Sequence, residues 1–332
     1  MQLLRKIAFP ISLVYALVVH IRNFLFDIGF FKSTSFKTPV ICVGNLSVGG
    51  TGKTPMIEYL IKILKEGNKV AILSRGYRRK SKGFVLATAS SKVEEIGDEP
   101  FQLHTKFADI TVAVDADRRN GIKNLQHLIN PDIILLDDAF QHRKVKSDCS
   151  ILLTAYDDLY VNDWYLPTGN LRDSKGEAKR ANLIIVTKCP EELTVGEQSK
   201  VVGLLRPESG QEVIFSYLSY GKEIKGKTSS MVQNDLLGKK VTLVTGIANP
   251  EPLVNYLSKK QLNIEHLQYK DHHFFSASEI ELFNSKDFVL TTEKDFARLK
   301  DQVAHLYYIQ VEHKFYGDGA SVLKKAVTAA IP

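Results

Sequence analysis

The stretch ICVGNLSVGGTGKTP, residues 41–55, decides the fold of this 332-residue chain. An apolar run leads into a glycine-rich loop, and the loop leads into an amphipathic segment, which is the strand–loop–helix order of a Walker A motif. Backbone N–H groups of such a loop converge on phosphate oxygens at the N-terminus of the helix. The motif predicts that Lys53 contacts the β- and γ-phosphates of ATP and that the Thr54 hydroxyl ligates Mg²⁺. The other predicted phosphate-binding residues are Gly49, Gly50, Thr51 and Gly52.

The Walker A match is imperfect, because Ser47 stands where the pattern expects its first glycine, and a glycine-rich turn without a nucleotide is an alternative. A second motif favours nucleotide binding. The apolar run 133–136 leads directly into Asp137 and Asp138. This is the form of a Walker B strand, whose terminal carboxylate holds Mg²⁺ beside the phosphate-binding loop. Gln141 follows within reach as a further candidate metal ligand. An ordinary strand end with acidic residues is the alternative, and the upstream loop favours the metal site.

Short apolar runs alternate with longer amphipathic stretches from residue 38 onward. This pattern predicts an α/β fold, a P-loop NTPase-type doubly wound sheet that is mostly parallel. The polar stretch GKEIKGKTSS, residues 221–230, separates this series from a smaller one that begins at residue 241. We therefore expect three parts: an N-terminal amphipathic helix in 1–35, a nucleotide-binding core in 36–220 and a smaller α/β domain in 221–332.

Residues that are present or missing separate the common classes of P-loop protein. A regulatory GTPase reads guanine with N-K-x-D, whereas the corresponding strand end here is TKCP, residues 187–190. Partitioning ATPases carry a second lysine before the paired glycines, where this chain has Val48, and no L-S-G-G-Q transporter signature occurs. Two classes remain: a phosphotransferase, and a membrane-associated P-loop ATPase that acts as a conformational switch without an acceptor.

The bulk composition is that of a globular protein with a modest positive charge. The chain has 44 Lys and Arg against 37 Asp and Glu, a net charge of +7, which suits an anionic partner. Its three cysteines are far apart and form no C-x-x-C pair, so we expect neither disulfides nor a zinc site. The basic loop 78–82 has few aromatic residues around it, and nucleic acid is not expected as a partner.

The N-terminal region has helical periodicity. Apolar residues recur with helical spacing from Ile11 to Ile28, and Ser12, His20 and Asn23 share the opposite face. The apolar run 7–19 is too short to cross a bilayer, which needs about 20 residues. Two interpretations remain, a helix packed on the core and a helix lying in the membrane interface.

A kinase also needs a group that orients or deprotonates the acceptor hydroxyl. Two loops carry candidate residues: Asp98 and Glu99 precede a predicted helix, and Asp271 to His273 lie between apolar stretches near the C-terminus. Helix capping explains the first pair equally well, and a solvated loop explains the histidines.

Eight short motifs occur together in this order: VGNLSVGGTGKTP, SRGY, GDEP, DRR, DDAFQH, LPTGNLR, DHHFF and TTEKD. In this respect the chain resembles the tetraacyldisaccharide 4'-kinase family of lipid A biosynthesis, and the resemblance covers essentially its whole length. The family places serine or threonine at the Ser47 position. Asn170 and Ala139 depart from the family pattern, where proline and glycine are expected.

The resemblance implies transfer of the γ-phosphate of ATP, with Mg²⁺, to the 4'-hydroxyl of a tetraacyl glucosamine disaccharide 1-phosphate. It pairs Asp98 with His272 as a catalytic dyad and makes Lys53 and Asp138 catalytic as well. Because a four-chain lipid stays in the bilayer, it favours a peripheral enzyme on the cytoplasmic face of the inner membrane, with no obligate protein partner. Weaker substrate-contact candidates are Glu99, Arg118, Arg119, His142, Asn170 and Arg172.

Overall fold

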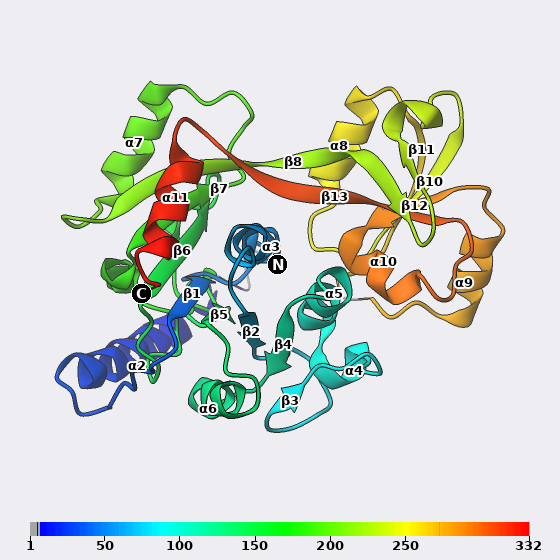
Figure 1. The fold of residues 1–332 in the computed structure, drawn as a ribbon. Helices are drawn as coiled ribbons and strands as arrows, with labels where there is room; N and C mark the ends of the chain where they lie inside the picture. The colour runs from blue at the N-terminus through cyan, green and yellow to red at the C-terminus, as the bar shows by residue number, and fades with distance from the viewer. Residues whose placement is uncertain (1–4, 6, 272, 332) are drawn as a thin grey trace. The chain divides into compact units, whose positions relative to one another are not determined.

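The computed structural model describes residue 5, residues 7–271 and residues 273–331. The chain forms two compact units, one of residues 1–218 and 313–332 and the other of residues 219–312. Each unit contains a mostly parallel sheet covered by helices, so the predicted α/β class is confirmed (Figure 1). Two long strands, β8 (Glu212–Gly226) and β13 (Leu306–Phe315), continue from one unit into the other.

The sheet of the first unit has the strand order β3-β4-β2-β5-β1-β6-β7-β8. Every neighbouring pair is parallel except β3 with β4. The central strands are buried along their whole length, which explains their continuous Val, Ile and Leu runs. The strands are β1 (Val40–Asn45), β2 (Val70–Ser74), β3 (Val85–Leu86), β4 (Thr111–Val114), β5 (Ile133–Asp137), β6 (Cys149–Ala155) and β7 (Leu183–Thr187).

Helices cover both faces of this sheet, as in a doubly wound fold. Alternate residues of β1 belong to different cores, Cys42 to one and Val43 to the other. Helices α3 (Lys53–Leu64), α5 (Asp98–Lys106) and α11 (Gly319–Thr328) pack in the core that contains Val43. Helices α6 (Arg118–Leu128) and α7 (Val195–Leu205) pack in the core that contains Cys42. The short helix α4 spans Val93–Ile96, and 3-10 turns cover Tyr160–Asn162 and Lys175–Arg180.

Register between β1 and β5 places the two nucleotide motifs side by side. Val43 pairs with Asp137, so the Walker A loop and the Walker B carboxylates emerge at the same edge of the sheet. Strand β1 leads into α3 on one face of the sheet, whereas β7, on the other side of β1, leads into α7 on the opposite face. Open α/β sheets bind ligands at such switch points.

The N-terminal helix α2 (Phe9–Asp27) contacts the first unit through its polar face. Ser12 and Asn23 are almost fully buried, whereas the large apolar side chains on the other side are exposed to solvent. The exposed apolar residues of this helix include Ile11, Leu13, Val14, Leu17, Val18, Ile21 and Phe24, each at least half exposed. The helix thus packs on the first unit, as one of the two interpretations expects, but it does so through its polar side and leaves its apolar side exposed.

The second unit has its own parallel sheet, in the order β11-β10-β12-β13, with β9 antiparallel to the end of β8. Its elements are β9 (Ser230–Val232), a 3-10 turn (Gln233–Leu236), β10 (Lys240–Thr245), α8 (Glu251–Lys259), β11 (Asn263–Gln268), α9 (Ala277–Asn284), β12 (Val289–Thr292) and α10 (Glu293–Leu299). The expected C-terminal domain ran to residue 332, but the chain returns to the first unit at His313. The reason is burial of Leu323 and Val327 of α11 against the large sheet.

Candidate active site

The phosphate-binding loop lies between β1 and α3. Gly52 adopts a φ of +82°, and a Cβ there would lie 3.1 Å from Nε2 of His313, so both backbone conformation and space require glycine. Gly49 has a φ of +121°. The hydroxyl of Thr187 donates a hydrogen bond to the carbonyl of Thr51 at 2.8 Å and ties the loop to β7. The predicted loop residues thus adopt the strand–loop–helix arrangement that the motif requires.

Lys53 and Arg172 converge on two acceptors, Asn45 and Asp138. The Lys53 ammonium donates to Oδ1 of Asn45 at 3.2 Å and lies 3.8 Å from Asp138. The Arg172 guanidinium donates to the same Asn45 oxygen at 2.6 Å and to both carboxylate oxygens of Asp138. Two cations therefore lie beside the loop that is expected to hold phosphates.

The two Walker B aspartates have opposite electrostatic environments. Asp137 is almost fully buried, and burial together with the charges of Glu99 and Asp138 raises the pKa of its carboxyl to about 7. Burial also disfavours the charged form of Asp138, but hydrogen bonds from Arg172 and the charge of Lys53 lower the pKa of Asp138. The hydroxyl of Ser74 donates to Asp137 at 3.1 Å.

The donor set suits Mg²⁺. Oxygen atoms of Thr54, Glu99, Asp137 and Asp138 gather at this edge, with the Thr54 hydroxyl 3.4 Å from Glu99. Burial, and after it the charges of Glu99 and Asp138, raise the pKa of Asp137, and a bound divalent cation would favour its charged form. No cluster of three or more His, Cys, Asp or Glu side chains in the described chain has the geometry to hold a metal by itself. In kinases, Mg²⁺ usually binds one or two carboxylates and completes its coordination with phosphates and water.

Unpaired buried polar atoms mark the same region. In the part of the chain that the structure describes, five buried side-chain N or O atoms have no hydrogen-bond partner. Buried polar groups are normally paired, so these atoms indicate where a polar ligand is expected. Four of the five belong to predicted site residues, namely Oγ1 of Thr51, Nε of Arg118, Nε2 of His142 and Nε of Arg172.

The other predicted metal and substrate residues occupy different environments. The Gln141 amide nitrogen donates to the carbonyl of Asn45 at 2.7 Å, beside the loop. Arg118 is buried and donates to the carbonyl of Asp137 at 3.4 Å. Arg119 instead pairs with Asp117 at the start of α6.

His142 and Asn170 each have a different set of polar contacts. The His142 ring lies 3.9 Å from Asp117, and burial together with the charge of Arg118 lowers the pKa of His142 to about 4. Asn170 accepts a hydrogen bond from Arg5 at 3.3 Å, and its carbonyl accepts one from the Val48 amide at 2.8 Å.

Asp98 begins helix α5, and its neighbour Glu99 faces Thr54. Its predicted partner His272 lies outside the described residues. The Asp98–His272 dyad therefore stays a prediction.

Sequence reasoning missed three residues that contact this site: Asn45, Ser74 and His313. Asn45 lies in the motif VGNLSVGGTGKTP and Ser74 in SRGY, each as the last residue of a strand that ends at the site. Their position at these strand ends could have identified them as site residues. The His313 ring is 3% exposed and lies 3.0 Å from both the Gly52 carbonyl and the Ser216 hydroxyl. A carbonyl only accepts, so Nε2 carries the proton, and Nδ1 accepts from Ser216. Burial lowers the pKa of His313 to about 4, which keeps the ring neutral.

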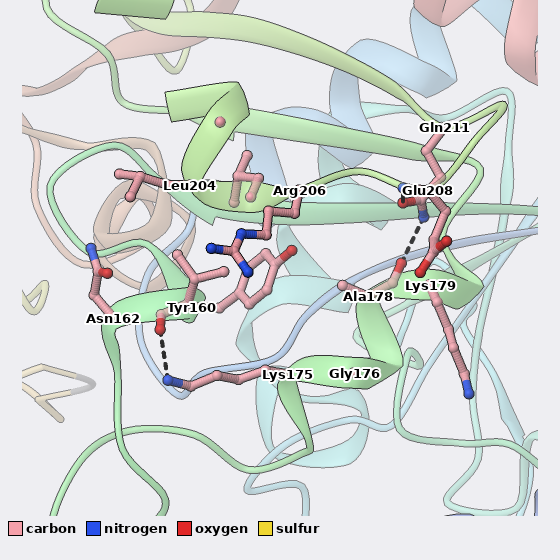
Figure 2. Close-up of a pocket in the computed structure, with 13 residues that line it drawn as sticks. Tyr160, Asn162, Lys175, Gly176, Ala178, Lys179, Leu204, Arg206, Glu208 and Gln211 are labelled. Atoms are coloured by element: carbon pink, nitrogen blue, oxygen red, sulfur yellow. Dashed lines mark hydrogen bonds between the residues drawn. The ribbon is translucent and has the colours of Figure 1, made fainter. Parts of the chain in front are cut away.

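A pocket of about 400 Å³ in the first unit involves none of the predicted site residues (Figure 2). It is lined by residues of the two 3-10 turns, among them Tyr160 and Lys175, and by residues at and after the end of α7, among them Arg206. A smaller pocket of about 40 Å³ lies beside the phosphate-binding loop and is lined by residues 46–51 together with 153–155, Asp158 and Tyr160.

Comparison with known proteins gives a consistent result. The family model described as tetraacyldisaccharide-1-P 4'-kinase matches residues 4–331. A tetraacyldisaccharide 4'-kinase of Flavobacterium johnsoniae is 51% identical over 95% of this chain and 94% of its own length. One from Bacteroides thetaiotaomicron is 44% identical over 89% of this chain and 83% of its own length. The crystal structure of LpxK from Aquifex aeolicus in complex with ATP superposes with a TM-score of 0.81 at 28% identity, covering 99% of this chain and 100% of that one.

We predict that His313→Ala raises the KM for ATP about tenfold and changes kcat less. Removal of the ring leaves the Gly52 carbonyl without its donor, and an unpaired buried carbonyl destabilises the loop conformation by about 1–3 kcal/mol. His313→Gln supplies an N–H and an acceptor and should restore the KM to within about threefold. Steady-state kinetics of the three proteins test this, and an unchanged KM in His313→Ala would contradict it.

The same residue gives a pH-dependent stability. The pKa of His313 is depressed from 6.5 to about 4, so its contribution is fully present above pH 6.5 and is lost as the pH falls through about 4. His313→Gln does not titrate, so between pH 7 and pH 4 the wild type should lose up to about 3 kcal/mol more unfolding free energy than the variant. Urea unfolding across this range measures the difference, and His142 is present in both proteins. Parallel pH profiles would argue against a buried neutral ring.

Proposed function

This chain belongs to the tetraacyldisaccharide-1-phosphate 4'-kinase family, and from that premise we infer that it transfers the γ-phosphate of ATP to the 4'-hydroxyl of a tetraacyl glucosamine disaccharide 1-phosphate. It is an ATP-dependent, Mg²⁺-using kinase that contributes to lipid A biosynthesis. Full-length similarity to named kinases supports this activity and gives no support to an ATPase switch without an acceptor.

The observation that carries the proposal is the set of unpaired buried donors beside the carboxylate cluster. Thr51, Arg118 and Arg172 each retain a buried donor without a partner, as a phosphate site requires. Asp137 retains a raised pKa, as a cation site requires. Buried donors next to a buried carboxylate cluster are complementary to a metal–phosphate pair.

The roles of individual residues follow from these positions. We assign phosphate binding to the loop amides from Gly49 to Gly52 and to Lys53, and metal binding to Thr54 with Asp137 and Asp138. Bound Mg²⁺ would neutralise charge on the β- and γ-phosphates. Lys53 and Arg172 would add positive charge on the same side and stabilise the negative charge that develops on the phosphates during transfer.

Asp98 is the proposed group that orients the acceptor hydroxyl, with His272 as its partner. An aspartate is a weak base for a sugar hydroxyl, so we assign Asp98 mainly to positioning that hydroxyl, with His272 fixing the orientation of its carboxylate. Its place at the start of α5, next to the Glu99 that faces Thr54, supports a position near the γ-phosphate. In-line positioning supplies most of the catalysis in phosphoryl transfer.

We also propose that α2 lies in the membrane interface on the cytoplasmic side, where ATP is available. By length and composition α2 is the one helix among the described residues that could cross a membrane. Its polar side is bonded to the soluble unit along its length, from Ser12 to Asp27, which favours an interfacial position. The exposed apolar side then meets lipid, where the acyl chains of the substrate reside.

A transfer assay tests the activity. With γ-labelled ATP and an acylated disaccharide 1-phosphate in mixed micelles, label should appear in the lipid. Asp98→Asn should lower kcat by about 10²–10⁴-fold while the KM for ATP changes little, because the group acts on the acceptor. Gln198→Glu, an equally small change on the far helix α7, serves as a control. Label found only in inorganic phosphate would remove the kinase assignment.

Vesicle sedimentation tests the membrane surface. The triple change Val14→Ser, Leu17→Ser and Val18→Ser removes exposed apolar side chains worth about 1.5–3 kcal/mol each when buried in lipid. Binding to phospholipid vesicles should weaken more than tenfold. Leu204→Ser, a similarly exposed leucine on α7, should bind as the wild type does. Equal binding by the triple variant would show that α2 is not the docking element.

A further inference from the structure

Residues 163–174, which we call the bridging segment, contact α2 on one side and the nucleotide site on the other. The segment contains the LPTGNLR motif, followed directly by Asp173 and Ser174. It makes hydrogen bonds both with α2 and with the phosphate-binding loop. This arrangement joins the proposed membrane helix to the active site through a single stretch of backbone.

On the α2 side, the Asp173 carboxylate is the centre of the contact. It is 0% exposed and accepts hydrogen bonds from Arg22 at 2.9 Å, from the Asn23 amide at 2.8 Å and from the backbone of Ser174 at 2.8 Å. The hydroxyl of Tyr15 donates to the carbonyl of Arg172 at 3.1 Å. The helix therefore holds two consecutive residues of the bridging segment.

A second attachment lies near the N-terminal end of α2. The buried Ser12 hydroxyl accepts from the amide of Thr168 at 3.0 Å and donates to its hydroxyl at 2.8 Å. Trp164 packs edge-on against Phe9, with ring centroids 5.6 Å apart. The bridging segment is thus fastened along most of α2.

On the active-site side, the bridging segment is bonded to the phosphate-binding loop. The amide of Arg172 donates to the Leu46 carbonyl at 2.9 Å, and the Val48 amide donates to the Asn170 carbonyl at 2.8 Å. The Ser47 hydroxyl donates to Asp163 at 3.0 Å. At its end, the Arg172 guanidinium reaches Asp138 and Asn45.

Asp173 and Arg172 are adjacent, so a shift of one moves the other. Arg172 points to the Walker B carboxylate, and Asp173 points to α2. In the Arg22–Asp173 ion pair the carboxylate is fully buried and the Arg22 side chain is 33% exposed. A buried salt bridge is weak evidence for stability, and Asp173 holds a defined position through its several hydrogen bonds.

We propose that Asp173 is a positioning residue through which docking of α2 on a bilayer sets the placement of Arg172 at the nucleotide site. The inference rests on the membrane position of α2 proposed above. A bilayer that holds α2 in place also orders the bridging segment, so that MgATP meets an already ordered Arg172. Ordering by one ligand favours the other, and the effect is reciprocal.

Reciprocal binding measurements on the full chain test this. The probes are a non-hydrolysable MgATP analogue and vesicles of phosphatidylglycerol in phosphatidylcholine. Trp164 is the single tryptophan of the chain and lies in the bridging segment, so its fluorescence reports vesicle binding at the relevant place. In the wild type, vesicles should raise the affinity for the analogue about fivefold or more, and the analogue should raise the affinity for vesicles by the same factor.

Asp173→Asn should still bind both probes, but the ratio of affinities with and without the other probe should fall to about one. Asp109→Asn is the matched control, because it removes a solvent-exposed ion pair with Lys65 in the same unit and should keep the wild-type ratio. If Asp173→Asn does not fold, the double variant Ser12→Ala and Tyr15→Phe loosens the same attachment without leaving a buried charge and should lower the ratio.

Three results would overturn the inference. A wild type that binds vesicles and analogue independently removes the coupling and leaves the membrane proposal intact. A variant that keeps the wild-type ratio removes the role of Asp173. A wild type that binds no vesicles removes both the membrane position and this inference, whereas the transfer assay in micelles still tests the kinase activity separately.

Discussion

The arrangement of the first unit depends on one constraint: the carboxylates and the cations at the carboxyl ends of β1 and β5 must balance each other. Parallel pairing of Val43 with Asp137 brings the Walker loop and the acidic strand end to one edge, so Glu99, Asp137 and Asp138 face Lys53 and Arg172. Burial, together with the charges of Glu99 and Asp138, still raises the pKa of Asp137 to about 7, so its carboxylate lacks a close cation. The neighbouring buried N–H and O–H groups of Thr51, Arg118 and Arg172 in turn have no hydrogen-bond acceptor. A metal ion with a polyphosphate satisfies both at once.

The parts of this site that were predicted from sequence lie in contiguous motifs at strand ends. Lys53 with Thr54 and Asp137 with Asp138 each follow an apolar run, and parallel strands bring their carboxyl ends to the same edge. Arg172 was only a weak candidate, because its partner Asn45 is 127 residues away. His313 is 261 residues from Gly52 and has no local pattern around it. Contacts between distant segments depend on the packing of the whole sheet, which no short motif encodes.

The N-terminal helix shows a different limit of prediction from sequence. Periodicity separated its polar face from its apolar face, and the structure has both where the spacing predicts them. Periodicity says how the two faces lie relative to each other but not which one contacts the protein. That choice is made by the partners, since Asp173 and Thr168 present hydrogen-bonding groups and not an apolar groove.

Attachment through the polar face has a consequence for how the helix can act. Apolar packing tolerates sliding and rotamer exchange, whereas the three donors on Asp173 specify one position of the carboxylate. The neighbouring Arg172 points towards Asp138 and Asn45. The exposed apolar side stays available for lipid while the polar side keeps its geometry. An amphipathic helix arranged in this way can meet a membrane and position an active-site cation without using the same surface for both.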